Sequence, residues 1–141
     1  MNTPKFLRFL ALAGVLLLSV AFTASAQRVR YNFNPGWKLF VGDAAGADKP
    51  GFNDASWKEV TLPRPFNEDE AFRVSIARHT DTIIWYRKHF RIPESHRGKK
   101  VFVEFEGIRQ GGDIYLNGQP LGLHENGVMA FGFDITSLVQ Y

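Results

Sequence analysis

The chain has 141 residues, no cysteine and a formal charge of +3, and it is rich in aromatic residues, with 13 Phe, four Tyr and three Trp. The lack of cysteine excludes a disulfide scaffold and a cysteine-ligated zinc protein, so packing must hold the fold. Lys and Arg are scattered along the sequence rather than clustered, which gives no sign of a nucleic-acid partner.

The first 26 residues have the three parts of an export signal. Lys5 and Arg8 precede an apolar run over residues 9–22, and the small residues Ala24-Ser25-Ala26 follow it. The run of about 14 residues is shorter than the roughly 20 that a spanning helix needs. We therefore expect residues 1–26 to be a cleaved signal peptide, with no stable membrane span, although an uncleaved anchor is the alternative. The mature chain, residues 27–141, is then expected to be one periplasmic or extracellular domain.

The first part of the mature chain alternates polar and apolar residues. Val29, Tyr31 and Phe33 predict an opening strand, which a turn at Pro35-Gly36 joins to a second strand over residues 37–41. Residues 42–54 are rich in Gly, Ala, Asp and Pro and predict a loop. Trp57 is expected to fill the core, and a short strand over residues 58–62 ends at Pro63.

The central stretch, residues 84–118, predicts three strands in succession. Residues 84–92 alternate, and only Lys88 interrupts the apolar face. Residues 94–100 are expected to be a surface connection that turns at Gly98. A second strand follows over residues 101–106. The third, over residues 113–116, is closed by Asn117-Gly118, a strong signal for a tight hairpin because both residue types tolerate positive φ.

The last part of the chain continues the β pattern. Residues 120–124 are expected to pair back through that hairpin, and residues 129–133 to form a final strand. Residues 134–139 read as one helical turn with a capping side chain at its start. Strands at short intervals with no long helix predict an all-β sandwich.

One connection is unusually long. Residues 63–82 have no steady period, and about twenty residues is more than ordinary connections need, so such loops are usually functional or disordered. Asn67, Glu68, Asp69 and Phe72 supply what sugar recognition uses: amides and carboxylates that bridge adjacent hydroxyls, and a ring that covers an apolar sugar face. The alternative is a solvated acidic turn followed by a Phe that anchors the loop in the core.

Several stretches resemble the N-terminal sugar-binding domain of family-two glycoside hydrolases, the β-galactosidase and β-glucuronidase family. In order they are FNDASWKEVTLPRPFN, WYRKHFRIP, GKKVFVEFEGI, DIYLNGQPLG and FGFDITSLV. The resemblance covers residues 31–141. It implies a jelly-roll β-sandwich of the galactose-binding-domain-like kind, followed in the family by an immunoglobulin-like domain and a catalytic barrel. The family also has a further closing strand, so we expect the domain to be truncated before its last strand and the chain to be an N-terminal fragment.

The resemblance also implies a function. The parent is expected to be an exported, retaining, β-galactosidase-like hydrolase of β-linked terminal sugars, with both catalytic carboxyl groups on the barrel, so we expect no catalytic residue and no cofactor in this chain. Its expected partners are a carbohydrate substrate and the other domains of the parent. In the family the long loop can reach the mouth of the barrel, which makes Asn67, Glu68 and Asp69 the substrate-binding candidates, with Asn67 first. A free-standing carbohydrate-binding module and a structural interaction domain are the alternatives.

Other polar residues carry weaker signals. Glu104 and Glu106 share one face of a strand, but an open face lacks the burial that would separate two carboxyl pKa values, so we expect solvated side chains. His79 and Asp81 are too few to make a metal site, although calcium held by loop oxygens stays open. Residues 109–112, Arg-Gln-Gly-Gly, predict either a contact with a neighbouring domain or a bulge.

Overall fold

The computed structural model of the chain describes residues 28–67 and 82–141. The chain divides into two units, residues 1–32 and residues 33–141. In the first unit, residues 28–32 have no regular secondary structure. The predicted signal peptide, residues 1–26, lies outside the described residues. In the described ranges, no helix has the length and apolar character that crossing a bilayer would require.

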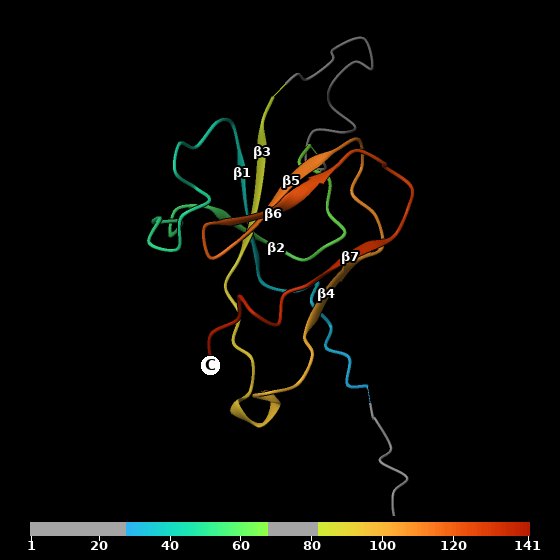
Figure 1. Cartoon of the computed structure of the whole chain (residues 1–141). Helices are drawn as coiled ribbons and strands as arrows, with labels where there is room; N and C mark the ends of the chain where they lie inside the picture. Colours follow the sequence, from blue (N-terminus) through green and yellow to red (C-terminus); the bar gives the residue numbers. More distant parts are fainter. Residues whose placement is uncertain (1–27, 68–81) are drawn as a thin grey trace, which may run out of the picture. The chain divides into compact units, whose positions relative to one another are not determined.

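The regular secondary structure described in the second unit is almost entirely antiparallel strands, joined by long irregular connections (Figure 1). One sheet has the order β2-β1-β3, a second pairs β4 with β7, and a third pairs β5 with β6. The all-β fold class is thus confirmed. The described strands are β1 (Trp37–Val41), β2 (Lys58–Val60), β3 (Ile84–Lys88), β4 (Phe102–Phe105), β5 (Gly112–Leu116), β6 (Gln119–His124) and β7 (Phe131–Asp134), and one short 3-10 helix, η2, covers Glu94–His96.

The core of the first sheet lies around its central strand, β1. Leu39 of β1 is opposite Tyr86 of β3, and Leu39 and Val60 of β2 are each 5% exposed. Trp57, just before β2, is 7% exposed and stacks on Phe40 with ring centroids 5.2 Å apart. The prediction that Trp57 fills the core is confirmed.

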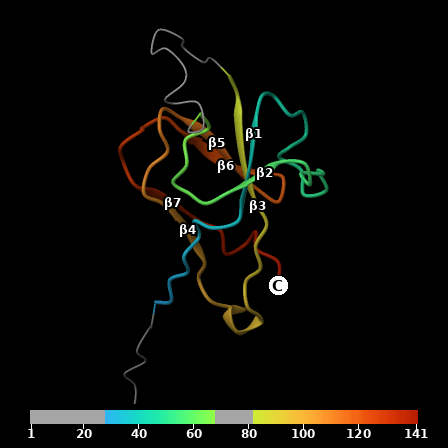
Figure 2. The same cartoon turned by 180° about the vertical axis from the view of Figure 1, so that it is seen from behind.

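The other two sheets meet through aromatic rings. Phe105 of β4 stacks on Phe131 of β7 with centroids 5.0 Å apart, and the His124 ring of β6 stacks on Phe131 at 3.6 Å. On the outward face of β4, Phe102 and Glu104 are exposed while the alternate residues are half-buried, as the period-two pattern predicts. Figure 2 shows β4 and β7 side by side from behind.

The predicted turns are also present. Asn117 and Gly118, between β5 and β6, have φ values of 52° and 79°, and Gly98 has a φ of 78°. After β7, the carbonyl of Ile135 accepts hydrogen bonds from the N–H groups of Leu138 and Val139. Asp134 caps this single turn, because its Oδ1 accepts from the N–H of Thr136 at 3.0 Å.

The predicted opening strand is wrong. Residues 28–34 contain no strand, and the Phe33 carbonyl, which a sheet ladder would need, accepts instead from Trp37 Nε1 at 2.8 Å. The Phe33 ring packs edge-on against Phe90, with centroids 5.0 Å apart.

The strand predicted over residues 84–92 is shorter than expected, because β3 ends at Lys88. The ammonium group of Lys88 donates to the carbonyl of Pro35. It also lies 5.0 Å from the centroid of the Phe33 ring. A cation can therefore occupy the apolar face because a carbonyl and an aromatic ring receive it.

Candidate functional site

Hydrogen bonds hold both ends of the long connection, residues 63–82. On the outgoing side, the N–H of Leu62 donates to the carbonyl of Asn34 at 2.9 Å, and the Tyr86 hydroxyl donates to the carbonyl of Arg64 at 2.7 Å. On the returning side, the Ile83 carbonyl accepts from the N–H of Gly42 at 2.8 Å. The loop therefore leaves and re-enters the first sheet at fixed positions.

The candidate sugar-binding residues lie beyond this base. Asn67 is exposed and is the last described residue on the outgoing side. Glu68, Asp69 and Phe72 lie outside the described residues, and so do His79 and Asp81. Their predicted roles, and that of Asn67, stay predictions.

A buried carboxylate, that of Asp54, binds a guanidinium on β3 and an imidazole just after it. Asp54 Oδ2 lies 2.8 Å from Arg87 Nε and 2.7 Å from His89 Nε2. Burial alone would raise the pKa of Asp54, but the hydrogen bonds and charges of His89 and Arg87 outweigh it and hold the pKa below 3.8. Asp54 is therefore an ionised partner near neutral pH.

The same guanidinium also holds the loop before β2. Arg87 Nη1 donates to the carbonyls of Ala47 at 2.5 Å and Lys49 at 2.9 Å, and Nη2 donates to Pro50 at 3.1 Å. Its donors are thus used within the fold. Sequence reasoning missed this cluster. Its one signal was that the alternation puts Arg87 and His89 on the same face of the predicted strand, where a nearby carboxylate would be favourable.

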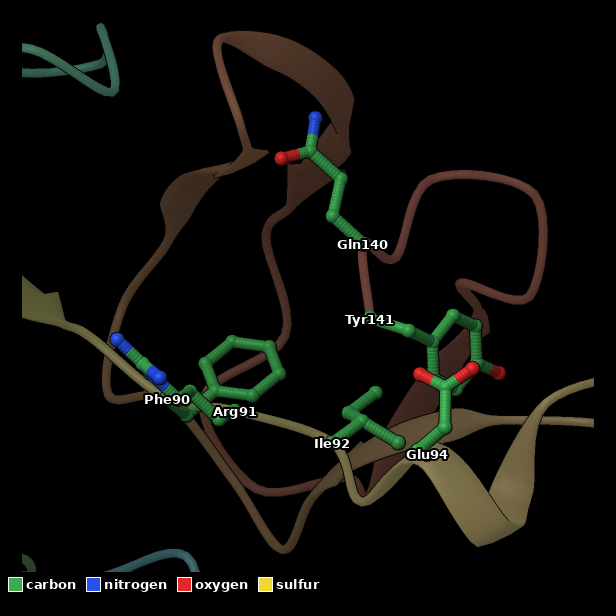
Figure 3. Close-up of a pocket in the computed structure, with 6 residues that line it drawn as sticks. All are labelled: Phe90, Arg91, Ile92, Glu94, Gln140 and Tyr141. Atoms are coloured by element: carbon green, nitrogen blue, oxygen red, sulfur yellow. The ribbon is translucent and has the colours of Figure 1, made fainter.

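An open depression of about 420 Å³ lies near the 3-10 helix (Figure 3). Glu94 at its edge is paired, because it accepts from Arg97 Nε at 2.5 Å and from Nη2 at 3.0 Å. The Arg97 guanidinium also lies 4.7 Å from the centroid of the Tyr141 ring. The lining residues are Phe90, Arg91, Ile92, Glu94, Gln140 and Tyr141.

The remaining candidates do not combine into a reactive site. Glu104 lies opposite Gly132 in the register, and Glu104 and Glu106 are both exposed. Within residues 28–67 and 82–141, no group of three or more His, Asp or Glu side chains is placed to hold a metal ion.

Gly111, after Arg109, does permit a close backbone approach, but the approaching backbone belongs to the same unit. A Cβ on Gly111 would lie 3.1 Å from the carbonyl oxygen of His124, and one on Gly127 would lie 2.9 Å from the backbone nitrogen of Gln110. Gln110 itself has a φ of 67°. The connections β4–β5 and β6–β7 are therefore packed backbone to backbone.

Comparison with known families identifies this β fold. The family model described as "Glycosyl hydrolase 2 galactose-binding domain-like" matches residues 57–141, more than half of the chain. The chain belongs to this family. The match runs from Trp57 through all the strands from β2 to β7, and it confirms the resemblance that the sequence motifs indicated.

Individual relatives are glycoside hydrolases. The chain is 39% identical over 124 residues to a β-glucuronidase of Formosa agariphila, covering 83% of this chain and 13% of the relative. It is 35% identical to a β-galactosidase of Thermoanaerobacter pseudethanolicus, covering 78% of this chain and 15% of the relative.

Solved structures of β-glucuronidases contain a similar fold. A family-two β-glucuronidase has a TM-score of 0.71 at 34% identity, over 82% of this chain and 13% of that one. A β-glucuronidase from Bacteroides uniformis has a TM-score of 0.71 at 27% identity, over 81% of this chain and 13% of that one. The chain thus spans about one seventh of the length of the enzymes it matches.

Proposed function

We propose that this chain is the N-terminal, non-catalytic module of a glycoside hydrolase that cleaves terminal β-linked sugars. The observation that carries this proposal is the family match over residues 57–141, together with the 13% to 15% of each relative that the chain covers. A β-galactosidase-like parent is the expected branch. The 39% identity to a β-glucuronidase makes a uronic-acid substrate the second candidate.

Within the parent, the module would lend the loop after Pro63 to the sugar site. The Asn67 amide can donate and accept at the same time, and the carboxylates of Glu68 and Asp69 can each accept from two hydroxyls. Recognition of this kind needs a fixed backbone, because a misplaced polar group loses its hydrogen bond while keeping its desolvation cost. The hydrogen-bonded base of the loop supports this role.

The proposal includes export. Residues 1–26 would direct the chain out of the cytoplasm and be removed, leaving a domain that begins at Gln27. The absence of cysteine makes the fold of that domain independent of the redox state of the compartment. Sequencing the N-terminus of the protein recovered outside the cytoplasm should give Gln27 as the first residue. Recovery with Met1 intact would overturn cleavage.

Two measurements test the parent activity. The reading frame past the codon for Tyr141 should stay open into a barrel with paired glutamates. The full product should then hydrolyse 4-nitrophenyl β-D-galactoside or the corresponding β-D-glucuronide. A frame that closes directly after Tyr141 would contradict the proposal, and glycan binding by the short chain would then favour a free-standing binding module.

The role of the loop is tested in the same full product. Asn67→Ala should raise KM about three- to thirtyfold, since it removes up to two hydrogen bonds to the sugar. Gln119→Ala removes another exposed amide, on β6, and should leave KM unchanged. Equal KM values for both variants would count against a sugar-binding loop.

A further inference from the structure

The Tyr86 side chain crosses from the first sheet to the base of the long connection. Its residue lies in the middle of β3, opposite Leu39, which is 5% exposed. Its hydroxyl donates at 2.7 Å to the carbonyl of Arg64, 22 residues earlier in the chain. The ring therefore lies on the half-buried surface of the sheet, while the hydroxyl is hydrogen-bonded to the base of the loop.

From this geometry we infer that Tyr86 is a positioning residue for sugar binding by Asn67, and this inference rests on the function proposed above. Asn67 is three residues beyond Arg64, so at most about 11 Å of extended chain separates them. Fixing the Arg64 carbonyl consequently limits where the Asn67 amide can lie.

The hydroxyl is suited to a permanent hydrogen bond. Burial raises the pKa of Tyr86 above its ordinary value of 10.0, with a smaller opposing effect from the charge of Arg64. The phenol is consequently a protonated donor at neutral and mildly alkaline pH. Its contribution to sugar binding should not vary with pH in that range.

Tyr86→Phe isolates this contribution, because it keeps the ring at the position opposite Leu39 and removes one oxygen atom. The Arg64 carbonyl would then bond to water, and the loop would sample more conformations. Apparent affinity falls in proportion to the fraction of molecules that are competent to bind. Since the barrel would carry the chemistry, the change should appear in KM and leave kcat unaltered.

The test is a double-mutant cycle in the full-length enzyme, with whichever 4-nitrophenyl β-D-glycoside the wild type cleaves. Tyr86→Phe should raise KM about three- to tenfold, the equivalent of one hydrogen bond. In an Asn67→Ala background it should raise KM no further, because the group that it positions is gone. An equal rise in KM in both backgrounds would show that Tyr86 acts independently of Asn67, and it would overturn the inference.

The two proposals fail in different ways. If Asn67→Ala raises KM but Tyr86→Phe does not, only the positioning role is wrong. If Asn67→Ala leaves KM unchanged, the sugar-binding role of the loop is wrong, and the positioning inference is overturned with it.

Tyr141→Phe is the matched control. It removes a tyrosine hydroxyl that donates to another backbone carbonyl, that of His96, at 3.2 Å. Tyr141, at the C-terminus, lies far from the start of β3 in both views (Figures 1 and 2). KM should be unchanged in this variant. Amide hydrogen exchange at Arg64, Phe66 and Asn67 should accelerate in Tyr86→Phe and stay at the wild-type rate in Tyr141→Phe.

Discussion

Arg87 Nε and Asp54 Oδ2 lie 2.8 Å apart, and both side chains are only 12% exposed. The same oxygen of Asp54 also meets His89 Nε2 at 2.7 Å. Because the Arg87 guanidinium also donates to backbone carbonyls of the loop before β2, one side chain of β3 fixes a segment that has no regular structure. The ion pair is thus a link between a strand and a loop.

We expect Arg87→Lys to lower the free energy of unfolding by about 2–4 kcal/mol. A single ammonium cannot replace the planar set of donors, and the buried Asp54 carboxylate and nearby carbonyls would lose partners. Urea unfolding measures the change. Arg97→Lys is the control, because Arg97 pairs with Glu94 where both side chains are more than 60% exposed, and such pairs contribute about 1 kcal/mol or less. Equal losses of unfolding free energy in the two variants would contradict a stabilising role for the buried hydrogen bonds of Arg87.

Asp134 predicts an acid-sensitive contribution to stability. Hydrogen bonds from Lys100, from the Thr136 hydroxyl and from the Thr136 N–H lower its pKa from 3.8 to about 2. A carboxyl whose pKa is depressed on folding stabilises the fold above its unfolded pKa and loses that contribution as the pH falls through the folded value. The stabilisation from Asp134 should thus be complete above about pH 5 and should disappear between pH 3.8 and about 2.

Asp134→Asn tests this titration. The difference in unfolding free energy between the wild type and the variant should be constant near neutral pH and should narrow as the pH falls from 4 towards 2. Chemical unfolding at several pH values measures the difference. A gap that keeps its size down to pH 2 would show that Asp134 does not titrate as described.

The hairpin between β5 and β6 separates a backbone effect from a side-chain effect at one residue. Asn117 has a φ of 52°, and its Nδ2 donates to the carbonyl of Leu138 at 2.9 Å. Asn117→Ala should cost about 1.5–3 kcal/mol, since it loses the hydrogen bond and puts an ordinary Cβ residue in the left-handed region. Asn117→Gly keeps the backbone free to turn and should cost about 1 kcal/mol. If Asn117→Gly lowers the unfolding free energy as much as Asn117→Ala does, the positive φ does not determine which residues this turn accepts.

The sequence was most informative where local chemistry decides the structure. Alternation located β3, β4 and β7, and the Asn117-Gly118 pair located the hairpin, because strand period and turn preference act over a few residues. The prediction of an opening strand was wrong because a local pattern does not decide which groups the backbone bonds to. Alternation over residues 29–33 shows that a strand is possible, but the carbonyl of Phe33 has another donor, Trp37 Nε1.

The candidate site depends on contacts between residues that are far apart in the sequence. Tyr86 and Arg64 are 22 residues apart, and Arg87 and Asp54 are 33 apart. No pattern within a strand says which loop its side chains will reach. Asn67 was chosen from the chemistry of its loop and from the family resemblance, whereas the hydroxyl that fixes its base could be recognised only from the fold.

Gly127 provides a test of the packing between the connections β4–β5 and β6–β7. A Cβ there would lie 2.9 Å from the backbone nitrogen of Gln110 and 3.5 Å from the Cα of Arg109, so one backbone must move. Gly127→Ala should therefore lower the free energy of unfolding by about 1–3 kcal/mol, the usual cost of overpacking. It should also shift the amide resonance of Gln110. Gly51→Ala is the control, because a Cβ at Gly51 meets nothing within 4 Å, and it should be neutral or stabilising by up to about 1 kcal/mol. Should Gly127→Ala be as well tolerated as Gly51→Ala, the two connections cannot be in backbone contact, and the Arg-Gln-Gly-Gly segment would be free to meet another surface.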